Sequence, residues 1–308
     1  MVAFLFAGQG AQYIGMGKDL YASFPESKAV FEKADKTLGF SLSELCFSGP
    51  REELTKTHNC QPAIVTMSIA CWEAFKSTRR REAGAPAYTA GLSLGEYSAL
   101  VAAEAVSFED AVYLVRQRGR FMEEAAVKNP GRMFSIIGLD LAKVKEICSQ
   151  TNTEIANLNC PGQIVISAGI GEADRAQAAA KEQGAKAVIA LEVSGAFHSS
   201  LMKDASLKLA AELDKIEIKA PKFPVISNVT AMPVSKPEEI KDNLVRQVAS
   251  PVLWEDSMKF ILSKGIMNFM EFGPGKVLKG LMRRINADAQ VVNIEKKEDI
   301  EGVRSNAL

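Results

Sequence analysis

The chain has 308 residues, of which 47% are hydrophobic and 24% charged, proportions typical of a globular protein rather than a disordered or fibrous one. Its 37 basic residues balance its 37 acidic ones, which argues against nucleic acid as the main partner, because neutralising phosphates requires an excess of Lys and Arg. Its five cysteines form no C-x-x-C pair, and no apolar run approaches the roughly 18 residues that cross a membrane, so we expect a cytoplasmic protein with reduced thiols, no metal site and no membrane contact.

Short strand patterns alternate with helical patterns along the chain, which favours an α/β fold. Strands are predicted at residues 2–6 and 87–90, and helices at residues 66–78, 94–105 and 108–127. Ser107 is well placed as the N-cap of the last of these helices, since an acidic side chain follows it at Asp110. The run Arg79-Arg80-Arg81 is interpreted as an exposed loop.

The middle of the chain has a pattern of its own. Strands are predicted at residues 133–138, 154–159, 163–167 and 186–193, and helices at residues 141–149 and 172–183. The resulting order, βαββαβ, is that of the ferredoxin-like unit. We therefore predict a ferredoxin-like small subdomain over residues 130–197, inserted into a large α/β subdomain made of residues 1–129 and 198–308.

Residues 91–95 read Gly-Leu-Ser-Leu-Gly, a G-x-S-x-G pattern between a predicted strand and a predicted helix. Glycines on both sides allow a tight turn that projects the Ser93 hydroxyl at the helix N-terminus, where free backbone N–H groups can stabilise an oxyanion. The pattern therefore indicates a serine nucleophile, with an ordinary turn as the alternative.

A serine nucleophile needs a base, and the chain offers only two histidines. His58 lies in the polar run Lys56-Thr57-His58-Asn59, which predicts a solvated loop. His198 directly follows the inserted unit, and a junction between subdomains is a common place for a site. His198 is therefore the better candidate for the base, and a structural histidine in a turn is the alternative.

Arg118 falls on the apolar face of the helix predicted at residues 108–127, close to Ala111 and Leu114. A guanidinium on a buried face must be paired or must line a cavity. Two interpretations stay open: an ion pair with an internal carboxylate, or a bidentate clamp for the carboxylate of a substrate.

Four basic residues follow the turn Gly273-Pro274-Gly275 at helical spacing: Lys276, Lys279, Arg283 and Arg284. They predict one basic helix face. That face is either simply solvated or a docking surface for an acidic carrier protein or for the phosphates of coenzyme A.

These motifs together resemble the malonyl-CoA:acyl-carrier-protein transacylases, and the resemblance covers nearly the whole chain. Residues 4–12 resemble the family's F-x-F-P-G-Q-G-S-Q, residues 61–63 its Q-P-A, residues 91–97 its G-H-S-L-G-E-Y and residues 195–202 its G-A-F-H-S-x-L-M. Later blocks match at residues 159–167, 227–229, 245–247 and 272–275. Leu92 stands where the family usually has a histidine after the first glycine of its serine motif.

The resemblance implies a role for several residues. Ser93 would accept the acyl group, and His198 would be its base and later the acid that protonates the departing thiol. The backbone N–H groups of Gln12 and Leu94 would form the oxyanion hole. Arg118 would hold the free carboxylate of the malonyl group.

Four further assignments complete the site that the resemblance implies. Gln247 would orient the catalytic histidine through its main-chain carbonyl, so that no Asp completes a triad. Phe197 resembles the malonyl-selective pattern of the family. Gln12 and Met122 are placed with Phe197 among the substrate-binding residues.

The function implied is an acyltransferase of fatty acid or polyketide biosynthesis. It would transfer a malonyl group from malonyl-CoA, through a malonyl-serine ester, to the pantetheine thiol of an acyl carrier protein, as a monomer and with no permanently bound cofactor. The alternatives are an acyl hydrolase of the same family, an α/β-hydrolase esterase, and a carrier-binding scaffold without catalysis. A hydrolase-like α/β core with a parallel sheet and a ferredoxin-like insertion is the fold implied.

Overall fold

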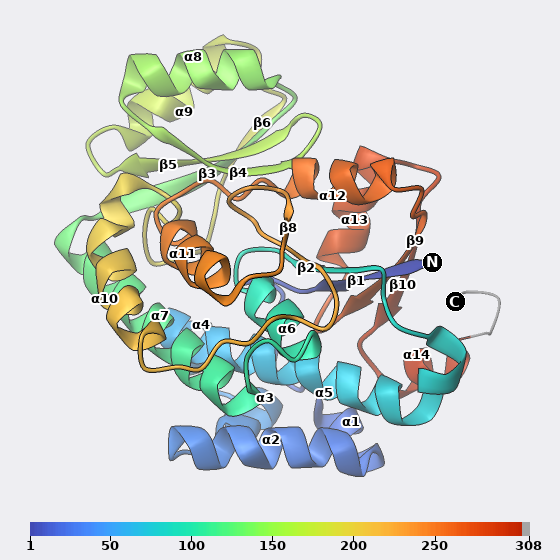
Figure 1. The fold of residues 1–308 in the computed structure, drawn as a ribbon. Helices are drawn as coiled ribbons and strands as arrows, with labels where there is room; N and C mark the ends of the chain where they lie inside the picture. Colours follow the sequence, from blue (N-terminus) through green and yellow to red (C-terminus); the bar gives the residue numbers. More distant parts are fainter. Residues whose placement is uncertain (304–308) are drawn as a thin grey trace.

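The chain forms two β-sheets that lie in separate layers (Figure 1). The computed structural model describes residues 1–303, with the backbone alone for residues 79–83. The larger sheet has the order β10-β9-β1-β2-β7-β8, in which all pairs are parallel except the last. Its strands are β1 (Val2–Phe6), β2 (Tyr88–Gly91), β7 (Val225–Ile226), β8 (Pro233–Val234), β9 (Asn268–Phe272) and β10 (Gln290–Ile294).

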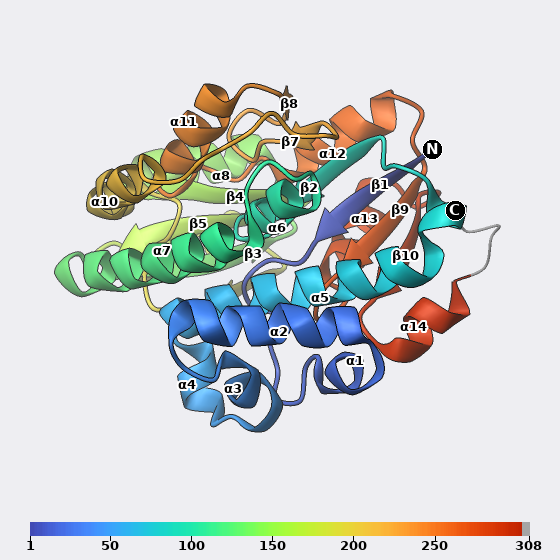
Figure 2. The same ribbon diagram turned by 60° about the horizontal axis from the view of Figure 1, so that its bottom comes forward.

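Helices cover both faces of the larger sheet, as a parallel sheet requires (Figure 2). The helices of this part are α1 (Lys18–Ser23), α2 (Pro25–Leu38), α3 (Leu42–Ser48), α4 (Arg51–Thr55), α5 (Thr57–Ala83), α6 (Gly95–Ala102), α7 (Phe108–Lys128), α10 (Lys203–Leu213), α11 (Pro237–Gln247), α12 (Trp254–Ser263), α13 (Val277–Ile285), α14 (Lys297–Gly302) and the 3₁₀ turn η1 (Ser200–Met202).

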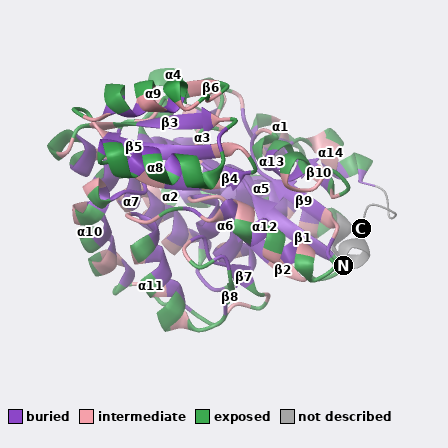
Figure 3. Ribbon diagram, turned by 90° about the horizontal axis from the view of Figure 1, so that it is seen from above, coloured by how far each residue is buried: buried purple, intermediate pink, exposed green. Residues whose placement is uncertain are grey.

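The central strand β1 is buried on both faces, which explains its uninterrupted apolar sequence. Phe4 and Phe6 point into the core that contains α2, α5, α6 and α7. Ala3 and Leu5 point to the other face, against α12 and α13. The buried strands at the centre of the molecule are visible in Figure 3. This three-layer arrangement fixes the carboxyl ends of β1 and β2 in the interior, next to the second sheet.

The smaller sheet is antiparallel and has the order β4-β5-β3-β6. Its elements follow in the order β3 (Gly131–Ile137), α8 (Leu141–Thr151), β4 (Glu154–Cys160), β5 (Gln163–Gly169), α9 (Ala173–Glu182) and β6 (Ala187–Ala190). The predicted βαββαβ order and the ferredoxin-like unit are thereby confirmed. The exact division of the chain at residues 130 and 197 stays a prediction.

The two faces of the smaller sheet differ in what they contact, because successive side chains of a strand point to opposite sides. Phe134 and Ile136 of β3 pack in the small core under α8 and α9. Met133 and Ser135 point the other way and line a cavity shared with the larger subdomain. Figure 1 shows α8 and α9 on the outer side of this sheet.

Helix α5 is the main departure from the sequence prediction. It begins at Thr57, so His58 lies in its first turn and not in a solvated loop. Pro62 lies inside the helix and cannot donate to the carbonyl of His58, and Arg116 Nη1 donates to that oxygen instead at 3.1 Å. The backbone of residues 79–81 belongs to the same helix, so the loop predicted there is wrong, and the high helix propensity of arginine agrees with this. The side chains of these three residues lie outside the described part of the structure.

Other predicted elements differ only at their ends. Helix α7 begins after Ser107, whose side chain accepts a hydrogen bond from the Asp110 amide at 3.0 Å, as predicted. Strand β6 is shorter than the predicted segment 186–193. All five cysteines are free thiols in the interior.

Candidate active site

Ser93 lies in a sharp turn between β2 and α6, and its backbone φ is 51°. A Cβ on Gly91 would lie 1.9 Å from the carbonyl carbon of Gly95, and a Cβ on Gly95 would lie 2.2 Å from the Phe6 carbonyl oxygen. Both positions therefore require glycine. The strained serine conformation is the geometry expected of a nucleophile at a strand-to-helix turn.

Asn228 holds this turn in place from the loop after β7. Its Oδ1 accepts a hydrogen bond from the Ser93 amide at 2.6 Å, and its Nδ2 donates to the Gly91 carbonyl at 2.8 Å. The Ser93 amide is therefore occupied. The next amide belongs to Leu94, which precedes helix α6 and has no carbonyl one turn back within that helix to receive its N–H.

His198 contacts the serine directly. The Ser93 hydroxyl lies 2.7 Å from His198 Nε2, and His198 Nδ1 lies 2.8 Å from the main-chain carbonyl oxygen of Gln247. Because a carbonyl can only accept, Nδ1 carries the proton and Nε2 is left free to accept the serine proton. No carboxylate contacts this imidazole among the hydrogen bonds and ion pairs of the described residues.

Burial keeps the imidazole neutral. His198 is 5% exposed, and its burial, reinforced by the positive charge of Arg118, lowers its pKa to about 4. The hydrogen bond to the Gln247 carbonyl opposes this shift but does not outweigh it. At neutral pH the ring is therefore an unprotonated base.

Arg118 is 1% exposed and is held by uncharged groups. Its Nη1 donates to Gln61 Oε1 at 2.9 Å, and its Nη2 donates to Gln247 Oε1 at 3.1 Å and to the Ser93 hydroxyl at 3.2 Å. Its Nε has no hydrogen-bond partner among the described residues. The guanidinium therefore lies against the nucleophile with donor capacity left for an anion, since no carboxylate of the described residues forms an ion pair with it.

Glu96 supports this arrangement from below the turn. Its Oε2 accepts hydrogen bonds from Gln247 Nε2 at 2.7 Å and from the Asn228 amide at 3.1 Å. Because Nε2 of Gln247 also donates to the Ser93 carbonyl, the amide is fixed with its oxygen toward Arg118. Burial raises the pKa of Glu96 to about 7.

Ser93, His198 and Arg118 lie in the wall of a cavity of about 300 Å³ between the two subdomains. Met122 of α7 and Phe197 also line it, so both lie in the same cavity as the serine. Side chains of the smaller sheet close the opposite wall. They are Met133, Ser135, Asn157, Asn159, Gln163 and Val165.

Gln9, and not Gln12, lies in the wall of this cavity. A Cβ on Gly8 would lie 2.6 Å from the Leu92 carbonyl oxygen, so the missing side chain lets this loop pack directly against the serine turn. Gln12 lines an adjoining cleft, where its Oε1 accepts a hydrogen bond from the amide two residues earlier at 2.9 Å. The structure thereby corrects the sequence assignment of Gln12 to the serine cavity.

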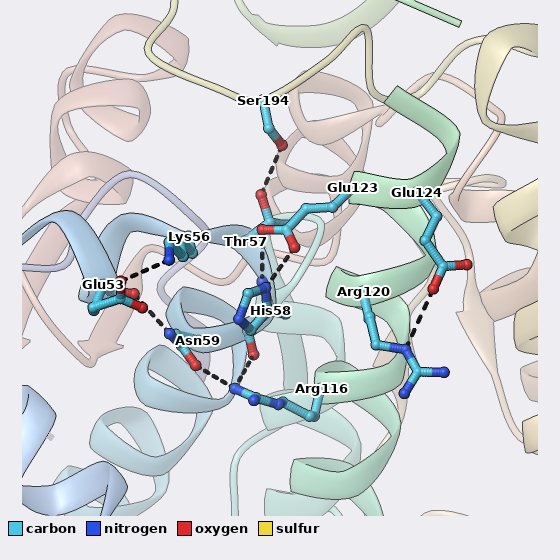
Figure 4. A network of polar contacts seen from close by, with 10 residues as sticks. All are labelled: Glu53, Lys56, Thr57, His58, Asn59, Arg116, Arg120, Glu123, Glu124 and Ser194. Atoms are coloured by element: carbon cyan, nitrogen blue, oxygen red, sulfur yellow. Dashed lines mark hydrogen bonds and ion pairs between the residues drawn. The ribbon is translucent and has the colours of Figure 1, made fainter. Parts of the chain in front are cut away.

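The second histidine is part of a structural network between α5 and α7 (Figure 4). His58 Nδ1 lies 2.5 Å from Glu123 Oε2, and both side chains are one quarter exposed. In the same network Thr57 Oγ1 lies 2.9 Å from the Ser194 hydroxyl, which ties the start of α5 to the segment after β6. His58 is thus engaged elsewhere, while His198 is the histidine that contacts the serine.

Within residues 1–303, no helix is both long and apolar enough to span a bilayer. The same residues contain no group of three or more His, Cys, Asp and Glu side chains arranged to bind a metal ion.

Comparison with known proteins matches the chain to a family. The model of the acyl transferase domain matches residues 3–297. The malonyl CoA-acyl carrier protein transacylase of Bacillus subtilis is 49% identical over 306 residues, which are 97% of this chain and 95% of the relative. The chain belongs to the malonyl-CoA:acyl-carrier-protein transacylase family.

Further relatives of this transacylase family agree. The Staphylococcus aureus transacylase is 42% identical over 99% of this chain and 98% of its own. A solved complex of a type II polyketide synthase acyl carrier protein with its malonyl-transacylase has a TM-score of 0.94 at 38% identity, covering 99% of both chains. An acyl carrier protein S-malonyltransferase from Vibrio cholerae also has a TM-score of 0.94, at 37% identity, covering 98% of this chain and 99% of that one.

Sequence reasoning missed four residues of this transacylase site: Gln9, Gln61, Glu96 and Asn228. All four lie in blocks that carry the family resemblance, so the sequence located them but did not predict their contacts. The buried position of Arg118 was the available signal, because a buried guanidinium requires acceptors such as the amides of Gln61 and Gln247.

The low pKa of His198 predicts how the rate of the transacylase reaction depends on pH at acidic values. With a folded-state pKa of about 4, His198 itself should not lower kcat/KM for malonyl-CoA between pH 8 and about pH 5, and a fall near pH 7 would instead report protonation of Glu96, whose pKa burial raises to about 7. Because the pKa is lower in the folded than in the unfolded state, burial of neutral His198 stabilises the fold above pH 6.5, and this contribution is lost as the pH falls from 6.5 to 4.

NMR titration of the imidazole signals checks this prediction. The chain has only two histidines, so a His58→Gln variant assigns the signal of His198. A midpoint of the His198 signal above pH 6, with activity falling in parallel, would contradict it.

Proposed function

We propose that this chain transfers a malonyl group from malonyl-CoA to the phosphopantetheine thiol of an acyl carrier protein, as a cytoplasmic, monomeric enzyme of fatty acid or polyketide biosynthesis. Membership of the transacylase family and the names of its relatives support this reaction. The proposed reaction needs no resident cofactor, because the thioester itself is the activated group.

The position of Arg118 is the observation that carries the substrate assignment. Its Nη2 lies 3.2 Å from the Ser93 hydroxyl. In a malonyl thioester one methylene separates the free carboxylate from the reacting carbonyl. A guanidinium directly beside the nucleophile therefore suits an anion this close to the reacting carbon, and a longer diacid would place its carboxylate elsewhere.

In the first half-reaction, the Ser93 oxygen attacks the thioester carbonyl while His198 Nε2 takes the hydroxyl proton. The tetrahedral intermediate then breaks its carbon–sulfur bond. The imidazolium returns the proton to the departing coenzyme A thiol, and a malonyl-serine ester remains. The Gln247 carbonyl holds the imidazole in the tautomer that this cycle requires.

The oxyanion of the intermediate needs two donors that are free of other partners. The Leu94 amide is one, since it precedes α6 and follows the occupied Ser93 amide. We assign the other to the backbone N–H of Gln9, because the loop at Gly8 packs against Leu92.

In the second half-reaction, His198 takes the proton of the carrier thiol, and the sulfur attacks the malonyl-serine carbonyl. Ser93 leaves and regains its proton from the imidazolium. The two half-reactions share one site, so the kinetics should be ping-pong.

Intact-protein mass spectrometry after a short incubation with malonyl-CoA, without carrier protein, tests this function. We expect a mass gain of one malonyl group in the parent and none in a Ser93→Ala variant, because that variant lacks the acyl-accepting oxygen. Acetyl-CoA should give little adduct, since it lacks the carboxylate.

The remaining outcomes identify the alternatives. Release of free malonate without a stable adduct would indicate a hydrolase. Faster turnover of a neutral ester than of malonyl-CoA would indicate an esterase. Carrier binding without any adduct would indicate a carrier-binding scaffold without catalysis. Each of these results contradicts the proposed transfer.

A further inference from the structure

The chain at His198 has a conformation that its own sequence does not favour. His198 has a backbone φ of 55°, and with Ser93 it is one of five residues other than glycine that have a positive φ in the described part of the chain. This left-handed region is unfavourable for a residue with a Cβ. Residues 191–199, between β6 and η1, form no helix or strand that could impose it. Contacts from other parts of the fold must therefore hold the histidine in this conformation.

Ser167 of β5 supplies one of these contacts. Its hydroxyl donates to the main-chain carbonyl of Phe197 at 2.5 Å, and the residue is 2% exposed. That carbonyl lies in the same rigid peptide plane as the His198 amide, and the φ of His198 is the rotation between this plane and its own Cα. The hydrogen bond from Ser167 therefore acts directly on the strained torsion.

Glu154 of β4 holds the chain on the other side of the histidine. Its Oε1 and Oε2 accept hydrogen bonds from the Ser200 amide at 3.0 and 3.1 Å, and Oε1 also accepts one from the Ser200 hydroxyl at 2.5 Å. Glu154 and Ser167 are direct partners in the register of β4 and β5, so their side chains lie on the same face of the smaller sheet. One pair of neighbouring side chains thus contacts the residue before His198 and the second residue after it.

The smaller sheet fixes the position of this pair. Strand β5 lies between β4 and β3, and Ser167 is paired with Met133 of β3 on its other side. Ser167 shares its face with Val165, which lines the serine cavity, whereas Ile164 and Ile166 point into the small core. The face of the sheet that forms a wall of the cavity is therefore also the face that holds the histidine.

Two further hydrogen bonds stabilise the same segment, but they act at other positions. The Ser199 hydroxyl donates to the Ala196 carbonyl at 2.6 Å and closes the turn around the histidine. Asn129, at the end of α7, donates through Nδ2 to the Leu201 carbonyl at 3.1 Å. Neither acts on the peptide plane that precedes His198, so Ser167 has a part that these contacts do not duplicate.

A change of this torsion would move the imidazole away from its partners. Rotation about the N–Cα bond of His198 moves Cβ and the ring together, while Ser93 and the Gln247 carbonyl belong to other segments and stay in place. The distances of 2.7 Å from Nε2 to the Ser93 hydroxyl and 2.8 Å from Nδ1 to the Gln247 carbonyl therefore both depend on the torsion. A displacement of about 1 Å in a reacting group can lower a rate by about a hundredfold.

We propose that Ser167 and Glu154 are positioning residues for the transfer reaction, which hold His198 in its left-handed conformation so that the smaller subdomain sets the geometry of the catalytic base. This inference rests on the proposed function, because it concerns the base of that reaction. Neither residue belongs to the lining of the serine cavity, so both act through His198 and not through contact with the substrate. The serine that ends the block at residues 159–167 thereby gains a role that the family resemblance did not assign.

The test measures malonyl-enzyme formation by rapid quench as a function of malonyl-CoA concentration. In Ser167→Ala we expect the maximal rate to fall about tenfold, because the base is less well placed, while the half-saturating concentration stays within about twofold, because Arg118 keeps its contacts. Ser167→Thr keeps the hydroxyl and suits a strand, so it should recover most of the rate. Glu154→Ala changes a partly exposed residue and should lower the maximal rate several-fold, which tests the proposal even where Ser167→Ala does not fold.

The matched control is Ser27→Ala. Ser27 is also a buried serine, and its hydroxyl donates to the Ala70 carbonyl at 2.8 Å between α2 and α5, outside the serine cavity. This variant should lose thermal stability, because it leaves a buried carbonyl without its donor, and keep the maximal rate of the parent. A parent-like maximal rate in either folded variant at Ser167→Ala or Glu154→Ala would overturn the proposal, as would a rate loss that Ser27→Ala shares. Absence of any malonyl-enzyme in the parent would instead overturn the proposed function.

Discussion

Replacing Arg118 with alanine is expected to lower kcat/KM for malonyl-CoA by about two to three orders of magnitude and to change that for acetyl-CoA by less than tenfold. In the parent, acetyl-CoA would bury the guanidinium against Ser93 with no anion to balance it, at a cost of about 3–5 kcal/mol. The variant has no buried cation, so this penalty against uncharged acyl groups disappears. Steady-state kinetics with both thioesters measure the change in selectivity.

Two controls separate selectivity from folding. Arg118→Lys keeps a positive charge but loses the planar fork, so it should recover only part of the malonyl preference. Thermal unfolding of each variant reports whether loss of the contacts to Gln61 and Gln247 destabilises the fold. If a variant at Arg118 still discriminated malonyl-CoA from acetyl-CoA as well as the parent does, the assignment of Arg118 to the malonyl carboxylate would be contradicted.

Replacing His198 with alanine should lower the rates of both half-reactions by about a thousandfold, because the same imidazole transfers the proton in each. Ser93 would keep its strained conformation, since Asn228 and the flanking glycines fix the turn. Rapid-quench measurement of malonyl-enzyme formation, and separately of its transfer to the carrier, gives the two rates. Added imidazole should restore part of the lost rate by entering the space left by the side chain.

The other histidine supplies the matched control. His58→Ala removes an imidazole that pairs with Glu123 between α5 and α7, away from the serine. We expect its malonyl-transfer rate to stay within a few-fold of the parent. A similar loss in both variants would mean that the histidines act through stability and not through proton transfer.

The sequence by itself determined the local features of this protein. Gly91 and Gly95 mark the serine turn because only glycine fits the close backbone approaches there, and such a need is visible in a short motif. The period-2 and period-3.6 patterns located the ferredoxin-like unit and helix α7, since these periods depend only on the geometry of each element. Arg118 was identified because a charged side chain is unexpected on the apolar face of a helix.

The tertiary structure decided which distant groups meet. Gln247 donates to Glu96 across 151 positions of the chain and accepts from Arg118 across 129. The resemblance had placed Gln247 at the site through its main-chain carbonyl, but no local pattern predicts the partners of its side-chain amide. The correction from Gln12 to Gln9 likewise depended on how one loop packs against Leu92. Short motifs specify turns and faces because their causes lie within a few residues, whereas the pairing of buried donors and acceptors follows from packing, which only the assembled sheets and helices define.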